Sequence, residues 1–291
     1  MGDRWLRVKY CYGGGVLCGM NAQSRWGEQQ RGKRVQRIFI TGGGSGIGAA
    51  TARLFAARGW EVGLADLNPA AIEATAASLP QGLARGFVMD VRDREAFAAA
   101  LADFAGAEGR IDVMMNNAGI AAGGALAANG WDEIDRVVGV NLMGVVNGAK
   151  LAFPYLKAAR GCLLNIASAA GIYGGPGIGI YAATKFAVRG LTESLDGEWA
   201  GEGVRVRSLM PSFIDTPLLE ASVSGTNYSV RQTVTAGGLE ITPVETVAEA
   251  AWAAVHGTRL HTPVGKTAQR LAFAARWMPG RLRRQMTRRR S

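Results

Sequence analysis

Short apolar runs alternate with alanine-rich, helix-compatible segments from Val35 onward, and this alternation limits the fold more than any other feature. The apolar runs lie at residues 35–41, 61–66, 86–90, 112–115, 162–167 and 204–210, and the helix-compatible segments at 47–58, 69–78, 93–106, 131–159, 180–200 and 244–256. Strands that alternate with helices build a parallel sheet through right-handed crossovers. We therefore predict an α/β fold, a doubly wound parallel sheet of about seven strands with helices on both faces.

The same pattern predicts one domain, over residues 35–265. Residues 1–34 show neither helical nor strand periodicity, and we expect a disordered extension or a misassigned translation start, outside the fold in either case. Residues 211–242 also lack a period, and so long a loop in a compact domain is more often a functional lid than an accident. Residues 266–291 form a basic, amphipathic tail that Pro279 and Gly280 break into two short segments.

The net charge of +10 is concentrated at the two ends of the chain. Residues 1–37 carry eight Lys or Arg against two acids, and residues 266–291 carry nine and no acid, so residues 38–265 have a net charge of −5. No basic face continues across the body, and we expect no nucleic-acid partner. The tail could lie on an anionic membrane surface, mediate self-association or be solvated.

Three cysteines without a CxxC spacing favour a reducing compartment, and two histidines make a metal site improbable. No signal peptide and no stretch of about 18 uninterrupted apolar residues is present. We expect a cytoplasmic protein, with peripheral contact at the inner membrane surface as an option through the tail.

The glycine-rich stretch "TGGGSGIG", residues 41–48, follows an apolar run and precedes a helical one. That context aims backbone N–H groups and a helix dipole at a pyrophosphate. Two glycine frames fit, one on Gly44 and Gly46 and a wider one on Gly42, Gly46 and Gly48. A glycine-rich turn without a ligand is the alternative.

Asp66 ends the second apolar run, 18 residues after Gly48. A carboxylate about 20 residues after such a loop hydrogen-bonds the adenosine ribose hydroxyls. It would repel a 2′-phosphate, and no Lys or Arg lies in the loop or just after Asp66. The sequence thus favours NAD over NADP, with a turn or helix-capping role for Asp66 as the alternative.

Tyr181 and Lys185 in "IYAATKFA" are four residues apart, on one face of a predicted helix. A tyrosine titrates near ~10 and is a weak base at neutral pH, but a nearby cation lowers its pKa. Tyr181 could then take a proton from an alcohol or give one to a ketone.

Six motifs occur in order at matching spacings: "TGGGSGIG" (41–48), "NNAG" (116–119), Asn141, "NIASAAG" (165–171), "YAATK" (181–185) and "PSFIDT" (211–216). Together they resemble the short-chain dehydrogenase/reductase family over residues 36–257. The resemblance implies a Rossmann-like fold, and an oxidoreductase that forms dimers or tetramers through the helices at 131–159 and 180–200.

The resemblance also implies roles for individual residues. Tyr181 matches the catalytic acid/base, Lys185 the residue that lowers its pKa and holds the nicotinamide ribose, and Ser168 the serine that binds the substrate oxygen. Asn141 matches the asparagine that anchors a water leading from the lysine to solvent. The implied cofactor contacts are Gly42, Ser45, Gly46, Ile47, Gly48, Asp66, Asp90, Val91, Asn117, Ala118, Gly119, Tyr181, Lys185, Pro211, Ile214 and Thr216.

One position departs from the family pattern, because Ser212 follows Pro211 where the family has glycine. Glycine permits backbone angles that serine rarely adopts, so we expect an altered turn near the nicotinamide without loss of activity.

We predict an NAD(H)-dependent oxidoreductase that interconverts a secondary alcohol and a ketone. Phe213, Leu218, Leu219, Tyr228 and Val230 in the lid favour a largely apolar substrate, although they could instead pack the lid. The alternative is a catalytically weak dinucleotide-binding or scaffold protein docked to a membrane by the tail.

Overall fold

The computed structural model of the protein describes residues 34–220 and 228–287. The chain divides into two units, Met1–Arg34 and Val35–Ser291, and the fold below is that of the second. Apart from Arg34, the segment expected to be disordered, residues 1–34, lies outside the described residues. Parts of the predicted lid and tail, residues 221–227 and 288–291, also lie outside them.

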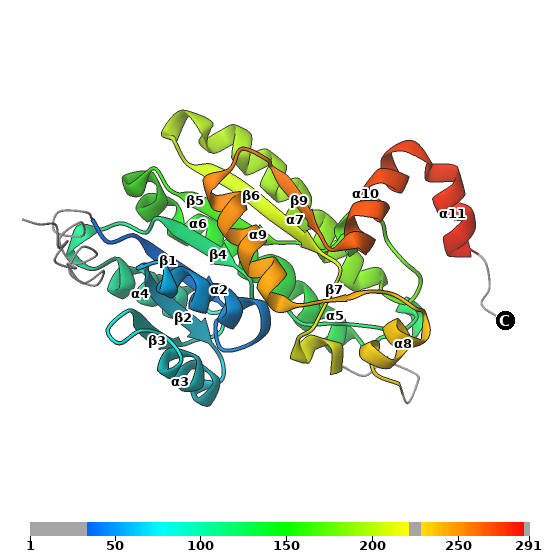
Figure 1. Ribbon diagram of the computed structural model, residues 1–291, viewed down its shortest axis with the longest axis horizontal. Coiled ribbons are helices and arrows are strands. Elements are labelled where there is room, and N and C mark those ends of the chain that lie inside the picture. Colours follow the sequence, from blue (N-terminus) through cyan, green and yellow to red (C-terminus); the bar gives the residue numbers. More distant parts are fainter. Residues whose placement is uncertain (1–33, 221–227, 288–291) are drawn as a thin grey trace, which may run out of the picture. The chain divides into compact units, whose positions relative to one another are not determined.

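Seven parallel strands form the central sheet in the order β3-β2-β1-β4-β5-β6-β9 (Figure 1). They are β1 (Arg37–Thr41), β2 (Glu61–Asp66), β3 (Ala84–Val88), β4 (Val113–Asn116), β5 (Cys162–Ile166), β6 (Arg205–Pro211) and β9 (His261–Val264). The strand order reverses between β1 and β4, where a crevice opens at the carboxyl ends of the strands in folds of this kind. The predicted doubly wound sheet is confirmed.

Helices cover both faces of the sheet and bury two separate core clusters. Phe55 and Val247 belong to the cluster under α2, α3 and α9, and Phe97 and Trp199 to the cluster under α4, α6 and α7. The helices are α2 (Gly46–Ala57), α3 (Pro69–Ala77), α4 (Arg94–Ala105), α6 (Gly144–Ala159), α7 (Gly179–Trp199) and α9 (Val244–His256).

Three elements differ from the sequence prediction. The strand expected at 86–90 lies two residues earlier, as β3, because Asp90 is in the following loop, paired with Arg92. The helix expected over 131–159 is divided into α5 (Trp131–Val138), a π-helical turn (Gly139–Met143) and α6. The edge strand β9 was not among the predicted apolar runs.

Taken together through the π-helical turn, α5 and α6 form a helical segment, Trp131–Ala159. Within the described residues it is the one segment with the length and composition to cross a membrane. It packs against β4, β5, α4 and α7, and 44% of its most apolar window is buried inside the domain. These contacts are those of a core helix.

The predicted lid contains short elements of its own: β7 (Phe213–Ile214), a 3₁₀ turn (Pro217–Glu220), α8 (Val230–Ala236) and β8 (Ile241–Thr242). Strands β7 and β8 pair in parallel. Arg231 on α8 forms ion pairs with Asp215 and Glu220, which fastens the helix to the start of the lid.

The tail forms two helices, α10 (Lys266–Trp277) and α11 (Pro279–Thr287), and the predicted break at Pro279 is confirmed. Proline suits the first position of a helix because its missing N–H has no partner there. Ala268 is fully buried, and Leu271, Ala272 and Ala275 pack against a third core cluster.

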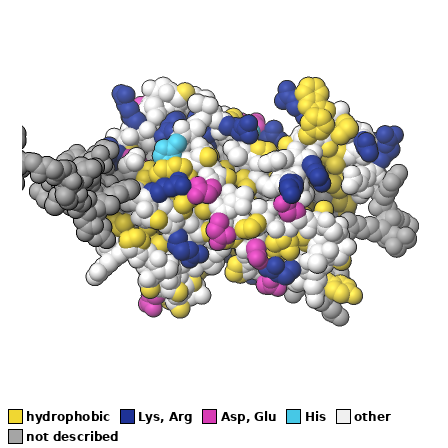
Figure 2. Space-filling model, viewed as in Figure 1, with side chains coloured by type: hydrophobic (Ala, Val, Ile, Leu, Met, Phe, Trp, Pro, Cys, Tyr) yellow, Lys and Arg dark blue, Asp and Glu magenta, His cyan; other side chains and the backbone are white. Residues whose placement is uncertain are grey.

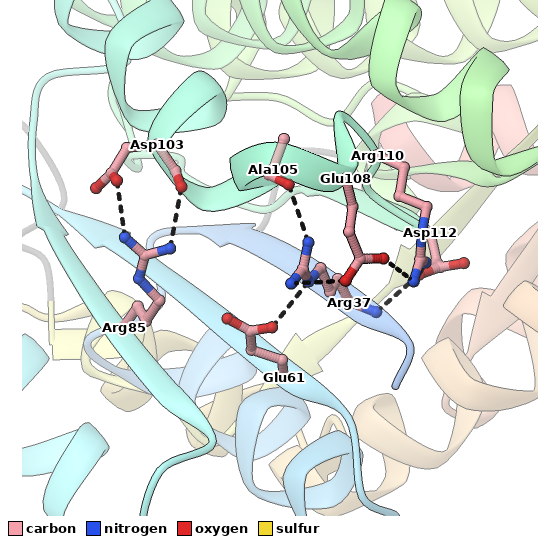
Figure 3. Close-up of polar contacts among 8 residues, drawn as sticks. All are labelled: Arg37, Glu61, Arg85, Asp103, Ala105, Glu108, Arg110 and Asp112. Carbon is pink, nitrogen blue, oxygen red and sulfur yellow. Dashed lines mark hydrogen bonds and ion pairs between the residues drawn. The ribbon is translucent and has the colours of Figure 1, made fainter. Parts of the chain in front are cut away.

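Ion pairs close the amino-terminal edge of the sheet, away from the reversal point (Figure 3). Arg37 pairs with Glu61 at 2.8 Å and with Glu108 at 3.4 Å, and Arg110 pairs with Glu108 and, at 3.2 Å, with Asp112. The Asp112 carboxylate also accepts a hydrogen bond from the Arg37 backbone N–H, at 2.9 Å. This network joins β1, β2 and the turn before β4.

Replacing Asp112 should destabilise the fold far more than replacing Asp103, which pairs with Arg85 nearby (Figure 3). Asp112→Ala leaves the buried Arg110 guanidinium with one partner fewer and should cost about 3 kcal/mol of unfolding free energy. Asp103 is exposed, so Asp103→Ala should cost less than about 1 kcal/mol. Urea unfolding measures both, and equal losses would contradict this account.

Candidate active site

Several predicted site residues lie where β1, β4 and β5 end, beside the reversal of the strand order. The glycine loop follows β1, Asn117 follows β4 and Ser168 follows β5. Helix α7 brings Tyr181 and Lys185 to the same edge.

The wider glycine frame is the one that the loop geometry requires. Gly42 and Gly46 have φ of +64° and +51°, a region that side chains rarely tolerate. A Cβ on Gly48 would lie 2.1 Å from the Gly42 carbonyl oxygen, so only glycine fits where the helix meets the loop. Gly44 has a negative φ, but a Cβ there would lie 2.8 Å from the Ala71 Cβ, so glycine is favoured at this position as well.

The start of α2 fits an anionic group. Ser45 is the N-cap but makes no side-chain capping bond, and the first turn contains no acidic residue. The first N–H groups of a helix have no partner within it, and the helix dipole favours negative charge at this end. Together with the close approach that the glycines allow, this arrangement suits the pyrophosphate of a dinucleotide.

Thr41 and Asn117 tie the glycine loop to the end of β4. The Thr41 hydroxyl accepts hydrogen bonds from the N–H groups of Asn117 and Ala118, at 3.0 and 3.1 Å. The Asn117 amide donates to the carbonyls of Thr41 and Gly42, at 2.9 and 3.1 Å. The Asn117 side chain therefore holds the glycine loop in place through the loop carbonyls. Thr41, which was not among the predicted site residues, holds the end of β4 in return.

Asp66 lies at the end of β2 and faces the glycine loop. One carboxylate oxygen accepts from the Gly44 N–H at 3.0 Å, and the other from the Asn68 N–H at 3.1 Å. Asn68, not Asp66, is the N-cap of α3. The structure thus places Asp66 beside the glycine loop, and each carboxylate oxygen retains capacity for a further hydrogen bond.

Asp90 and Val91 follow β3. Arg92 forms a hydrogen-bonded ion pair with Asp90, at 2.6 Å, and this contact holds the pKa of the Asp90 carboxyl below its usual value. The Val91 carbonyl accepts from the Asn147 amide at 2.9 Å. Sequence reasoning did not identify Arg92 as the partner of Asp90.

Lys185 is a buried cation without a carboxylate partner among the described residues. Its ammonium group donates to the Ile166 carbonyl at 3.0 Å and lies 5.6 Å from the centroid of the Tyr181 ring. Burial lowers the pKa of Lys185 to about 8, so the group is still mostly charged at neutral pH.

Ser168 and Tyr181 meet beside Lys185. The Ser168 hydroxyl accepts from the Ala170 N–H at 3.1 Å. Burial raises the pKa of Tyr181, and a hydrogen bond with Ser168 opposes that rise without cancelling it. The sequence-based expectation of a lowered tyrosine pKa is therefore wrong for the protein alone, because desolvation of the phenolate outweighs the favourable contacts.

Asn141 lies in the π-helical turn and is fully buried. Its amide oxygen accepts from the Ile120 N–H at 2.8 Å, and its amide nitrogen donates to the Ile120 carbonyl at 2.9 Å. A Cβ on Gly119 would lie 3.3 Å from the Asn141 oxygen and 3.6 Å from the Lys185 nitrogen, so no side chain separates the two at this point.

The segment after β6 returns to the glycine loop. Thr216 lies close to Gly46, since a Cβ there would be 3.1 Å from the threonine methyl group. Ile214 is buried. Arg160 is the one non-glycine residue with a positive φ in the described ranges, so Ser212 has an ordinary backbone conformation. The Ser212 N–H donates to the Val264 carbonyl at 3.2 Å. Serine after Pro211 thus requires no strained backbone.

A buried row of polar side chains, not predicted from the sequence, positions α7. Asn116 donates to Asn165 at 3.0 Å, Asn165 donates to Thr192 at 3.0 Å, and Thr192 donates to the Val188 carbonyl at 2.8 Å. The sequence contains a sign of this row, because Asn116 ends the otherwise apolar strand "VMMN" and Asn165 interrupts "CLLNI".

Comparison with known proteins identifies relatives of this chain. The sequence profile described as short chain dehydrogenase matches residues 36–227. Meso-2,3-butanediol dehydrogenase from Serratia marcescens is 41% identical, over 62% of this chain and 71% of the relative. The 3-oxoacyl-(acyl-carrier-protein) reductase from Thermotoga maritima is 39% identical, over 62% and 75%.

Solved structures share the fold. A short-chain dehydrogenase/reductase from Burkholderia phymatum, in complex with NAD, superposes with a TM-score of 0.77. It is 28% identical, and the match covers 88% of this chain and 98% of that protein.

Proposed function

Because the chain belongs to the short-chain dehydrogenase family, we propose that it is an NAD-dependent oxidoreductase that interconverts a secondary alcohol and a ketone. The observation that carries this proposal is the meeting of Ser168, Tyr181 and Lys185 beside a loop that suits a pyrophosphate. A protein that only bound a dinucleotide would have no need of a buried, unpaired lysine under a tyrosine.

The residues that would hold the cofactor form a continuous path along the carboxyl edge of the sheet. The glycine loop and the start of α2 would bind the pyrophosphate, Asp66 the adenosine ribose, and Asp90 and Val91 the adenine. When bound, NAD accepts or supplies the hydride. Asn117, Ala118 and Gly119 would also line the adenosine ribose. The residues at the reactive end of the cofactor would be Lys185, Pro211, Ile214 and Thr216.

The protein's own part in the reaction is to handle the proton. In alcohol oxidation the C–H bond of the substrate would release a hydride, which bound NAD would accept, and the O–H bond would release a proton to Tyr181, which must first be present as tyrosinate, stabilised by the Lys185 charge. Ser168 holds the substrate oxygen by a hydrogen bond. In ketone reduction, Tyr181 returns the proton, and its raised pKa keeps the phenol protonated for this step.

Lys185 and Asn141 would maintain the proton supply. The charged Lys185 stabilises tyrosinate electrostatically. One of its N–H bonds is used by Ile166, which leaves two for the cofactor ribose and a water. Asn141, held by Ile120, would anchor that water beside Gly119.

We propose a largely apolar secondary alcohol as the substrate and a homodimer or homotetramer as the assembly. In the lid, Leu218 is exposed and Leu219 is buried. Trp131 on α5 and Phe186 on α7 are 80% and 42% exposed, and α5 contacts α7, which supports these two helices as the surface for self-association. Light scattering measures the mass of the assembly in solution and so distinguishes a monomer, a dimer and a tetramer.

Tyr181→Phe should lower turnover at least about 100-fold, because it removes the acid/base hydroxyl. NADH affinity should change by no more than about 3-fold, since the ring and Lys185 remain. Tyr155→Phe on α6 is the matched control and should keep full activity. A panel of secondary alcohols, including 2,3-butanediol, steroidal and aromatic examples, identifies the substrate through NADH absorbance.

Turnover that persisted in Tyr181→Phe would contradict the mechanism. NADH binding by the wild-type protein with no turnover of any alcohol or ketone would favour the binding-protein alternative.

The wild-type protein should have a kcat/KM for NAD at least about 10-fold above that for NADP, because the Asp66 carboxylate repels a 2′-phosphate. Asp66→Asn should reduce this ratio by weakening the repulsion. Glu73→Gln, which removes an exposed charge from α3, should leave the ratio unchanged. A preference of the wild type for NADP would overturn the role given to Asp66.

A further inference from the structure

Helix α10 has one face that is part of the domain core. Ala268, Leu271, Ala272 and Ala275 follow the i, i+3, i+4, i+7 spacing of a buried stripe. Ala268 is fully buried, and the other three pack against the cluster that includes Ala167, the neighbour of Ser168. The helix is therefore anchored rigidly beside the candidate active site.

A second stripe with the same spacing faces away from the core: Arg270, Phe273, Ala274 and Trp277. Phe273 and Trp277 are 59% and 63% exposed, and Met278 follows at 36%. Figure 2 shows hydrophobic and basic side chains gathered on the part of the surface formed by α10 and α11. Two large aromatic side chains adjacent on one exposed face are typical of an interaction surface.

A groove of about 540 Å³ runs between α10 and α11. Phe273, Ala274, Met278 and Leu282 make it apolar, and Arg270 and Arg281 line it with charge. Leu282 is buried and holds α11 against α10, which gives the groove a fixed second wall.

Every charged residue of α10 and α11 is basic. Lys266 lies 4.0 Å from Glu240, but no carboxylate within the described ranges forms an ion pair with Arg270, Arg276, Arg281, Arg283 or Arg284. Residues 38–265 have a net charge of −5, so this pair of helices contrasts sharply with the body.

We propose that α10 and α11 form a docking surface for an anionic phospholipid bilayer. Trp277, Phe273 and Met278 would enter the headgroup region, and the arginines would contact lipid phosphates, with Arg270 and Arg281 receiving one in the groove. A symmetric contact with a second copy would bring the unpaired arginines of both copies together, which disfavours that occupant. Charge complementarity selects the anionic lipid.

The docking surface lies at the edge of the sheet that carries the candidate active site. Strand β9 ends at Val264, and α10 begins two residues later. Binding would bring this edge close to the bilayer surface, where apolar alcohols concentrate. The lipid contact itself does not depend on the proposed activity, and Tyr181→Phe should bind vesicles like the wild type.

Sedimentation of the full-length protein with vesicles tests the proposal. Vesicles with about 30% phosphatidylglycerol should bind the protein, phosphatidylcholine vesicles should bind it weakly, and about 0.5 M salt should release it. Phe273→Ala with Trp277→Ala, and separately Arg270→Gln with Arg281→Gln, should each weaken binding about 10-fold or more. Phe273→Leu with Trp277→Leu should retain more affinity than the alanine pair.

Arg53→Gln with Arg259→Gln is the matched control, because it removes two exposed positive charges from the body. It should bind within about 2-fold of the wild type. Equal binding to both kinds of vesicle, or an equal loss in this control, would overturn the proposal. A third result would also overturn it: the Phe273→Ala, Trp277→Ala variant binds vesicles as well as the wild type but has a lower mass by light scattering. The stripe would then mediate self-association.

Discussion

The site is organised around the ammonium group of Lys185, which is buried without a carboxylate to neutralise it. Burial of an unpaired charge disfavours the charged form, and the pKa of about 8 expresses that cost. A carboxylate partner would stabilise the lysine but would cancel the positive field that a tyrosinate needs. The protein instead satisfies Lys185 with the uncharged Ile166 carbonyl, so the charge remains available to Tyr181.

The fold holds this unfavourable arrangement in place from several directions. The row of Asn116, Asn165 and Thr192 ties α7 to the two central strands, so the helix cannot rotate to turn Lys185 outward without breaking buried hydrogen bonds. The π-helical turn brings Asn141 into the core at the level of Gly119, and the packing of α10 supports the segment around Ser168. Polar groups fix the geometry, and the apolar layers on both faces of the sheet supply the stability.

Much of this could be predicted from the sequence, and the exceptions have physical reasons. The buried strands are largely apolar, and the glycine loop and the Tyr181–Lys185 spacing are local patterns, so all were visible in the sequence. Strand β9 was not, because an edge strand such as "HTPV" is half-buried and contains Pro263. The roles of Thr41 and Arg92, and the raised pKa of Tyr181, depend on burial and on partners distant in the chain, which a local pattern does not reveal.

The stability of Lys185→Met across pH tests the central claim most directly. Below pH 8 the folded and unfolded chains are both protonated at Lys185, and the wild type carries the full cost of burial. Between pH 8 and the unfolded value of 10.5, the folded chain loses its proton first, so wild-type stability rises. Lys185→Met should therefore be about 1–2 kcal/mol more stable than the wild type at pH 7, after the lost hydrogen bond is counted, and the gain should shrink toward pH 10. A variant less stable at pH 7, or a difference that does not change with pH, would contradict the account.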